Sequence, residues 1–176
     1  MSARVDHLVV GAADLASGMR WIEDRIGVAP IAGGAHEGLG THNALVGLGD
    51  RYLEVLAPDP EQPTATSPLV EQLRALPTPE LLTIAVATSG LSDPIPMSRL
   101  RPDGVLLEWQ LQSTSTPLFF IDWQDTPRPA GLPDGGRITA LTVTTPEPDQ
   151  LRDVEGVDVR EGLWRVDASI NGTPLA

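Results

Sequence analysis

The side chains best suited to bind a metal ion lie near the start of the sequence. All three histidines, His7, His36 and His42, fall within the first 42 residues, and Glu54 follows in an apolar segment. Imidazole nitrogen and carboxylate oxygen together suit divalent zinc, iron, manganese or nickel. We therefore expect a divalent metal held by His7 and Glu54, with His36 or His42 completing a set of two histidines and one carboxylate.

A structural interpretation of the same residues needs no metal. His7 and Glu54 each lie among apolar neighbours, where an ionised carboxylate is costly unless it is paired or coordinated. A buried histidine hydrogen-bonded to a neighbouring glutamate meets that requirement by itself. His36 lies in the glycine-rich segment 33–40, and a histidine in such a loop is more often exposed or caps a turn. Both interpretations stay open on the sequence alone.

The amino-acid composition excludes several kinds of chemistry. The 176-residue chain contains no cysteine, and all 12 of its basic residues are arginine. Disulfides, zinc–thiolate sites, cysteine nucleophiles, lysine Schiff bases and P-loop phosphate sites are therefore excluded. The net charge of −12 disfavours nucleic acid and anionic membranes as partners. Because the sequence has neither a targeting signal nor an apolar run of the roughly 18 residues that a membrane span needs, we expect a cytoplasmic protein.

The elements that position these residues follow a repeated order of strand, helix and strands. The first unit, residues 1–57, opens with a buried strand at 5–10 that carries His7. A helix follows, with Asp14 as its N-cap and Gly27 at its C-terminal end, and further strands lead to Glu54. A proline-rich linker with a short helix at 68–76 separates this unit from the second.

Two further units complete the expected fold. The second, residues 80–125, has strands but no convincing helix, because residues 89–101 are rich in proline and serine. The third, residues 137–176, is a partial unit with a strand, a short helix and two or three short strands. Three passes of similar element order indicate internal repetition of a βαβββ unit within one globular chain.

Four ordered motifs over about residues 4–125 resemble the glyoxalase-like branch of the vicinal oxygen chelate superfamily. The first motif, Asp6–Val10, opens a strand, and the second is the helix Asp14–Ile26 followed by Gly27-Val28. The third is the run Gly33–Leu45 together with Tyr52–Val55. The fourth consists of Asp103–Val105, Trp109 and Phe119–Trp123. The resemblance implies an α+β fold in which paired βαβββ modules form a cupped mixed β-sheet with a cavity on its concave face. It also implies that His7 and Glu54 are the metal ligands of the first module.

The second module departs from the pattern of that superfamily. Thr83 stands where the second metal-binding histidine is expected, and a hydroxyl is a poor ligand for a borderline ion. Asp122 occupies roughly the place of the second carboxylate, with Glu108 as a neighbouring alternative. We therefore expect Glu54 and Asp122 to be the catalytic carboxylates, Asp122 serving as the base.

These residues suggest two functions. The first is a metal-dependent lyase, isomerase or oxygenase acting on a small oxygenated molecule, with Asn43 orienting the ligand and Trp109 and Trp123 lining the cavity. The alternative is a metal-free binding protein of the bleomycin-resistance type. Because the chain is acidic, a cationic ligand would be favoured. Arg99 and Arg101 could bind a substrate carboxylate, although solvated surface positions are more usual for them. Uncovered strand edges would favour a homodimer.

Overall fold

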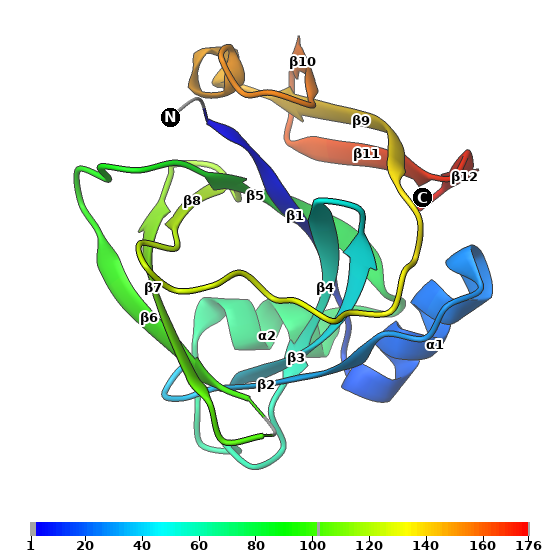
Figure 1. Cartoon of the computed structure of the whole chain (residues 1–176), viewed down its shortest axis with the longest axis vertical. Helices are drawn as coiled ribbons and strands as arrows, with labels where there is room; N and C mark the ends of the chain where they lie inside the picture. The colour runs from blue at the N-terminus through cyan, green and yellow to red at the C-terminus, as the bar shows by residue number, and fades with distance from the viewer. Residues whose placement is uncertain (1–2, 102, 176) are drawn as a thin grey trace.

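Two consecutive sets of four strands form a closed barrel in the computed structural model, which describes residues 3–101 and 103–175 (Figure 1). Residues 1–2 of the first expected unit and residue 176 of the third lie outside the described part. The first set comprises β1 (Arg4–Gly11), β2 (Ile31–His36), β3 (Thr41–Leu48) and β4 (Arg51–Pro58); the second comprises β5 (Glu80–Ala87), β6 (Ile95–Leu100), β7 (Leu106–Ser113) and β8 (Phe119–Asp122).

The two sets have the same internal arrangement. In space the first runs β1-β4-β3-β2 and the second β5-β8-β7-β6, with the first and fourth strands of each set parallel to each other. The sets join where β1 pairs antiparallel with β5, His7 lying opposite Ala85, and where Ala35 of β2 meets Leu100 of β6. Each inward position of the first set therefore has a counterpart in the second.

Two helices pack on the barrel. Helix α1 (Leu15–Ile26) begins where Asp14 accepts a hydrogen bond from the backbone N–H of Ser17 at 2.8 Å. It ends at Gly27, whose φ of 74° is accessible to glycine without strain, and it buries Ile22. Helix α2 (Pro68–Ala75) begins at the N-cap Ser67 with proline in its first turn and lies against β4.

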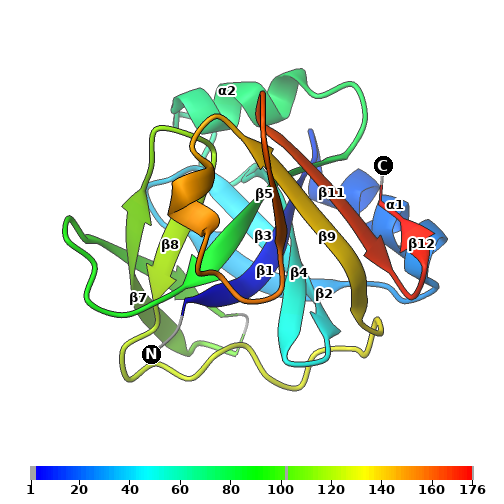
Figure 2. The same cartoon turned by 90° about the horizontal axis from the view of Figure 1, so that it is seen from above.

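The C-terminal part of the chain forms a second, four-stranded sheet. Its strands are β9 (Ile138–Thr145), β10 (Asp158–Glu161), β11 (Arg165–Ile170) and β12 (Thr173–Pro174), in the order β10-β9-β11-β12, with a 3-10 turn η1 (Pro148–Leu151) after β9. Figure 2 shows β9 and β11 lying across the outside of the barrel at β1 and β5. Apolar side chains of both sheets meet there in a buried core.

This second sheet determines which side chains of β1 face the barrel interior. Leu8 and Val10 point outward into the core shared with β9 and β11, and both are fully buried. His7 and Val9 point into the barrel instead. The alternation of side chains along a strand thus directs the imidazole of His7 inward while its neighbours hold the two sheets together.

The architecture confirms the expected α+β class and adds one strand that the sequence did not predict. Residues 95–100 form β6, a strand that the prolines around it obscured in the sequence. It pairs along its whole length with β7 but with β2 at only one residue pair. Because the edge of β6 that faces β2 is used so little, the missing N–H of Pro96 is tolerated. Residues 137–175 form their own sheet and do not extend the barrel. Within the described ranges, no helix is both long and apolar enough to cross a membrane.

Candidate functional site

The barrel encloses a cavity of about 860 Å³. Its buried polar side chains are concentrated on the first four strands, whereas β7 and β8 supply mostly apolar ones. Further polar residues line the cavity elsewhere: Gln72, Glu80, Thr83, Ser113, Thr114, Thr116 and Arg165. The polar corner consists of His7, His36, Thr41, Asn43, Tyr52, Glu54 and Arg99. The apolar wall includes Leu56, Met97, Trp109, Leu111, Phe119, Ile121 and Trp123. The cavity therefore combines a buried polar corner with an extended apolar wall.

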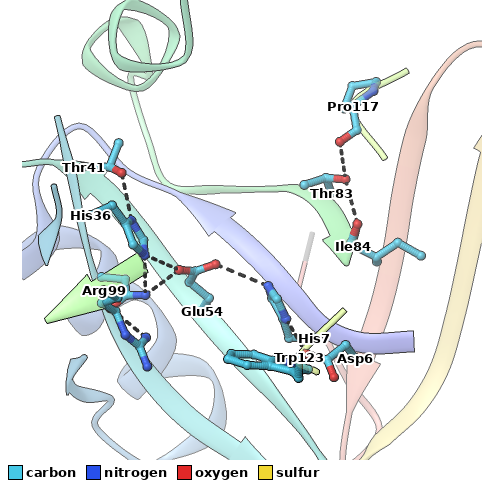
Figure 3. A network of polar contacts seen from close by, with 11 residues as sticks. Asp6, His7, His36, Thr41, Glu54, Thr83, Ile84, Arg99, Pro117 and Trp123 are labelled. Atoms are coloured by element: carbon cyan, nitrogen blue, oxygen red, sulfur yellow. Dashed lines mark hydrogen bonds and ion pairs between the residues drawn. The ribbon is translucent and has the colours of Figure 1, made fainter. Parts of the chain in front are cut away.

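Glu54 lies at the centre of the polar corner, between the two buried histidines (Figure 3). Its Oε1 accepts a hydrogen bond from Nδ2 of Asn43 at 2.5 Å and lies 3.8 Å from Nε2 of His36. Its Oε2 lies 3.4 Å from Nε2 of His7. Although burial alone would raise the pKa of Glu54, the hydrogen bond from His7 and the charge of that imidazole lower it to about 2. The carboxylate is therefore ionised at neutral pH.

His7 is held in one orientation by groups on three sides. Its Nδ1 bonds to Oδ2 of Asp6 at 2.9 Å, its Nε2 faces Glu54, and its ring stacks on Tyr52 with centroids 4.4 Å apart. Burial alone would lower the pKa of His7, but the hydrogen bonds to Asp6 and Glu54 raise it to about 9. At neutral pH the imidazole is a cation between two carboxylates.

Asp6 is the second carboxylate of this network and is almost fully buried. It accepts hydrogen bonds from His7 and, at 3.2 Å, from Nε1 of Trp123, and its Oδ1 lies 2.9 Å from Nη2 of Arg128. Burial alone would raise the pKa of Asp6, but the hydrogen bond and charge of His7 lower it. The ring of Trp123 is thereby fixed against the cavity, where its centroid lies 5.4 Å from that of Trp109.

Asn43 links the remaining polar groups. Its Nδ2 also lies 3.3 Å from Nε2 of His36, and its Oδ1 accepts a hydrogen bond from Nη1 of Arg99 at 3.3 Å. Since Nδ2 donates in both of its contacts, Nε2 of His36 is the acceptor and Nδ1–H donates to Oγ1 of Thr41 at 2.9 Å. Burial lowers the pKa of His36, consistent with this neutral tautomer.

Two of the predicted site residues lie outside the cavity. His42 lies between the inward-facing Thr41 and Asn43 on β3, so its side chain is on the opposite face of the strand. Asp122 lies between Ile121 and Trp123, which line the cavity, and its carboxylate instead accepts backbone hydrogen bonds from Gln124 and Gly90.

The strand registers identify the counterparts of His7 and Glu54 in the second set. In the first set, Glu54 pairs with Val9, which lies two residues after His7. In the second set, Phe119 pairs with Ala85, which lies two residues after Thr83. Phe119, not Asp122, therefore occupies the position that corresponds to Glu54. The hydroxyl of Thr83 donates to the backbone oxygen of Pro117 at 2.9 Å. Glu108, the other carboxylate considered, is exposed on β7.

Comparison with known proteins agrees with the motifs and the strand order. A family model described as the glyoxalase-like domain matches residues 5–154. The chain belongs to this family. It is a glyoxalase-like member of the vicinal oxygen chelate superfamily, in which divalent metals are common. No curated protein shows a match to the chain.

Solved structures resemble this glyoxalase-like domain at low sequence identity. A hypothetical protein from Staphylococcus aureus is 16% identical with a TM-score of 0.60, over 93% of this chain and 88% of the other, which shows a shared fold. Methylmalonyl-CoA epimerase from Mycobacterium tuberculosis is 16% identical with a TM-score of 0.46, over 72% and 89%. A variant of the Streptomyces coelicolor epimerase, in complex with 2-nitronate-propionyl-CoA, is 16% identical with a TM-score of 0.47, over 73% and 100%.

The donor set of this glyoxalase-like domain does not fit a divalent metal. His7 and His36 approach different oxygens of Glu54 from opposite sides of its carboxylate, so their nitrogens do not face a common point (Figure 3). The second set of strands offers Thr83 and Phe119 where further ligands would be needed. Across residues 3–101 and 103–175, no three His, Asp or Glu side chains are grouped so as to hold an ion.

Two residues of the network, Asp6 and Tyr52, were not assigned a role from the sequence, and a third, Arg99, was considered for a substrate carboxylate but expected at the surface. Asp6 adjoins His7, and strict alternation would place it on the opposite face, but the register of β1 against β5 shifts between Val5 and His7. Tyr52 stacks on His7 from the neighbouring strand. Arg99, expected on the surface, is 4% exposed and lines the cavity because β6 closes the barrel there.

Proposed function

We propose that this protein binds a small organic molecule in the barrel cavity without a metal. The cavity volume of about 860 Å³ lies in the range that accommodates small ligands, and its mixture of apolar wall and localised polar groups is typical of such sites. Trp109 and Trp123 offer aromatic faces on which a ligand ring or chain packs. Asn43, whose amide is held by three neighbours, helps to orient the polar end of the ligand.

The main support for this proposal is that both carboxylate oxygens of Glu54 already contact other side chains. A metal-binding carboxylate directs its free lone pairs toward the ion, but here Asn43 and the protonated His7 already engage both oxygens of Glu54. A divalent ion would have to displace the contacts that Asn43 and His7 make with Glu54. The arrangement supports the structural interpretation of the His7–Glu54 pair and, with it, the metal-free alternative.

The competing hypothesis is a metal-dependent lyase, isomerase or oxygenase with zinc, iron, manganese or nickel on His7, His36 and Glu54. Metal analysis of the purified protein tests it directly. After incubation with Zn²⁺, Mn²⁺, Fe²⁺, Co²⁺ or Ni²⁺ and removal of free ions, we expect substoichiometric metal and an unchanged melting temperature with chelator. One equivalent of metal that is lost in Glu54→Gln would overturn the proposal. His42→Gln, which alters a histidine outside the cavity, is the matched control.

A further inference from the structure

Arg99 is a buried cation of the cavity that forms no ion pair among the residues that the structure describes. Its side chain lines the cavity from β6, with only 4% of the residue exposed. Nη1 donates one long hydrogen bond of 3.3 Å to the neutral amide of Asn43. Among the described residues, Nε has no hydrogen-bond partner. A guanidinium has five N–H donors in a planar fork, so most of its capacity is directed at the cavity or left unused.

The neighbouring carboxylates are engaged elsewhere. Glu54 is held by Asn43 and His7, and Asp6 by His7, Trp123 and Arg128. Within the part of the chain that the structure describes, Arg99 forms no ion pair within 4.0 Å. Burying an unpaired charge is costly, so we expect an anionic group of a bound ligand to act as the counter-ion of Arg99.

The whole chain is acidic, with a net charge of −12, which is the basis for expecting a cationic ligand. At this end of the cavity, however, the carboxylates of Asp6 and Glu54 are already held by other side chains. The buried guanidinium of Arg99 therefore favours an anionic group of the ligand here.

The glycines of β2 make room for this arrangement. A Cβ added to Gly33 would lie 2.1 Å from Oδ1 of Asn43 and 3.1 Å from Nη1 of Arg99. At Gly34, which has a φ of +138°, it would lie 2.0 Å from the backbone oxygen of Leu100. Any larger residue at these positions would displace the Arg99–Asn43 pair or separate β2 from β6. The glycine-rich segment thus serves to seat the arginine against the cavity.

We propose that the cavity selects an amphipathic carboxylate, whose anionic group pairs with Arg99 and whose apolar body lies along Met97, Trp109 and Leu111. This inference rests on the proposed binding function and specifies the chemistry of the ligand. A carboxylate matches the planar fork of arginine through two parallel hydrogen bonds. The other lining arginine, Arg165, is exposed and already paired with Asp167, so it adds no second binding site for an anion.

Calorimetric titration with matched ligands tests this assignment. The probes are octanoate, octan-1-ol and octylamine, and 2-naphthoate with the corresponding naphthylmethanol and naphthylmethylamine, so that each series keeps one skeleton and changes only the head group. We expect at least one carboxylate to bind roughly tenfold or more tightly than its alcohol. Arg99→Met, which keeps a similar stem and removes the charge, abolishes this preference. Arg101→Met, a change to an exposed arginine paired with Asp103, retains it.

The outcomes separate the ligand class from the binding function. Equal binding of carboxylate and alcohol, or tightest binding of the amine, overturns the role of Arg99 while leaving the cavity a binding site. Failure of every probe to bind overturns both proposals. Retention of the carboxylate preference in Arg99→Met would also refute the assignment. Because Arg99 has no ion pair among the described residues, the melting temperature of unliganded Arg99→Met should equal or exceed that of the wild type, and its measurement checks that the variant is folded.

Discussion

Replacing His7 by glutamine should remove most of the pH dependence of stability between pH 6.5 and 9. The hydrogen bonds to Asp6 and Glu54 raise the pKa of His7 from 6.5 to about 9 despite its burial. At about 1.4 kcal/mol per pKa unit, this shift corresponds to about 3 kcal/mol of folding free energy. The lowered pKa of Glu54 expresses the same ion pair, so the two contributions are not added.

The sign of the effect follows from the direction of the shift. Because the pKa of His7 is higher in the folded than in the unfolded chain, its stabilisation is complete below pH 6.5 and disappears as the pH rises through about 9. Few other groups titrate in this window, since the chain has no cysteine or lysine and burial raises the pKa of its one tyrosine, Tyr52.

Urea unfolding at several pH values measures this contribution. The free energy of unfolding of the wild type should fall by about 3 kcal/mol from pH 6.5 to 9, and that of His7→Gln should stay nearly flat. At neutral pH His7→Gln should also be destabilised by roughly 3–5 kcal/mol, because Asp6 and Glu54 lose their shared cation. The control His42→Gln should follow the wild-type profile. A flat wild-type profile, or a wild-type slope retained in His7→Gln, would refute the charged His7–Glu54 pair.

Three further changes test the site and the fold. Asn43→Ala should lower the free energy of unfolding by about 1–3 kcal/mol, because Glu54 and His36 lose a buried donor; an unchanged melting temperature would contradict this. Gly33→Ala should weaken carboxylate binding measured by calorimetry, since its Cβ would collide with Asn43; undiminished affinity would show that the close approach is not needed. Ile170→Ala, in the core between the two sheets, should lower the free energy of unfolding in urea by about 2–5 kcal/mol without changing ligand affinity. Leu163→Ala, at a position 89% exposed, should change neither the free energy of unfolding nor the affinity.

Local signals in the sequence were sufficient to predict much of the fold. The N-cap Asp14 and the terminal Gly27 both lie at the ends of α1, because these signals act on the backbone within a few residues. Glu54, singled out in the sequence because it lies among apolar neighbours, faces the cavity from β4. β6 was missed because its prolines are tolerated only through its limited pairing with β2, which is a property of the assembled barrel.

The site was harder to predict because its contacts are long-range. Arg99 is 56 residues from Asn43 in the chain, and Trp123 is 117 residues from Asp6, so neither contact leaves a local pattern. Asp122 lies three residues after Phe119, the counterpart of Glu54, and its side chain is on the face of β8 that turns away from the cavity, because side chains alternate along a strand. Residue type alone also does not distinguish a histidine that binds metal from one protonated by two neighbouring carboxylates.

The most direct test of the central claim is anomalous diffraction from crystals of the wild-type protein grown with Zn²⁺ and, separately, with Mn²⁺. Data collected at the absorption edge of each ion locate any bound metal independently of its chemical effects. The account predicts no anomalous peak among His7, His36 and Glu54, with the His7–Glu54 pair retained. An ordered peak about 2.0–2.2 Å from the nitrogens of both histidines and from a Glu54 oxygen would contradict it.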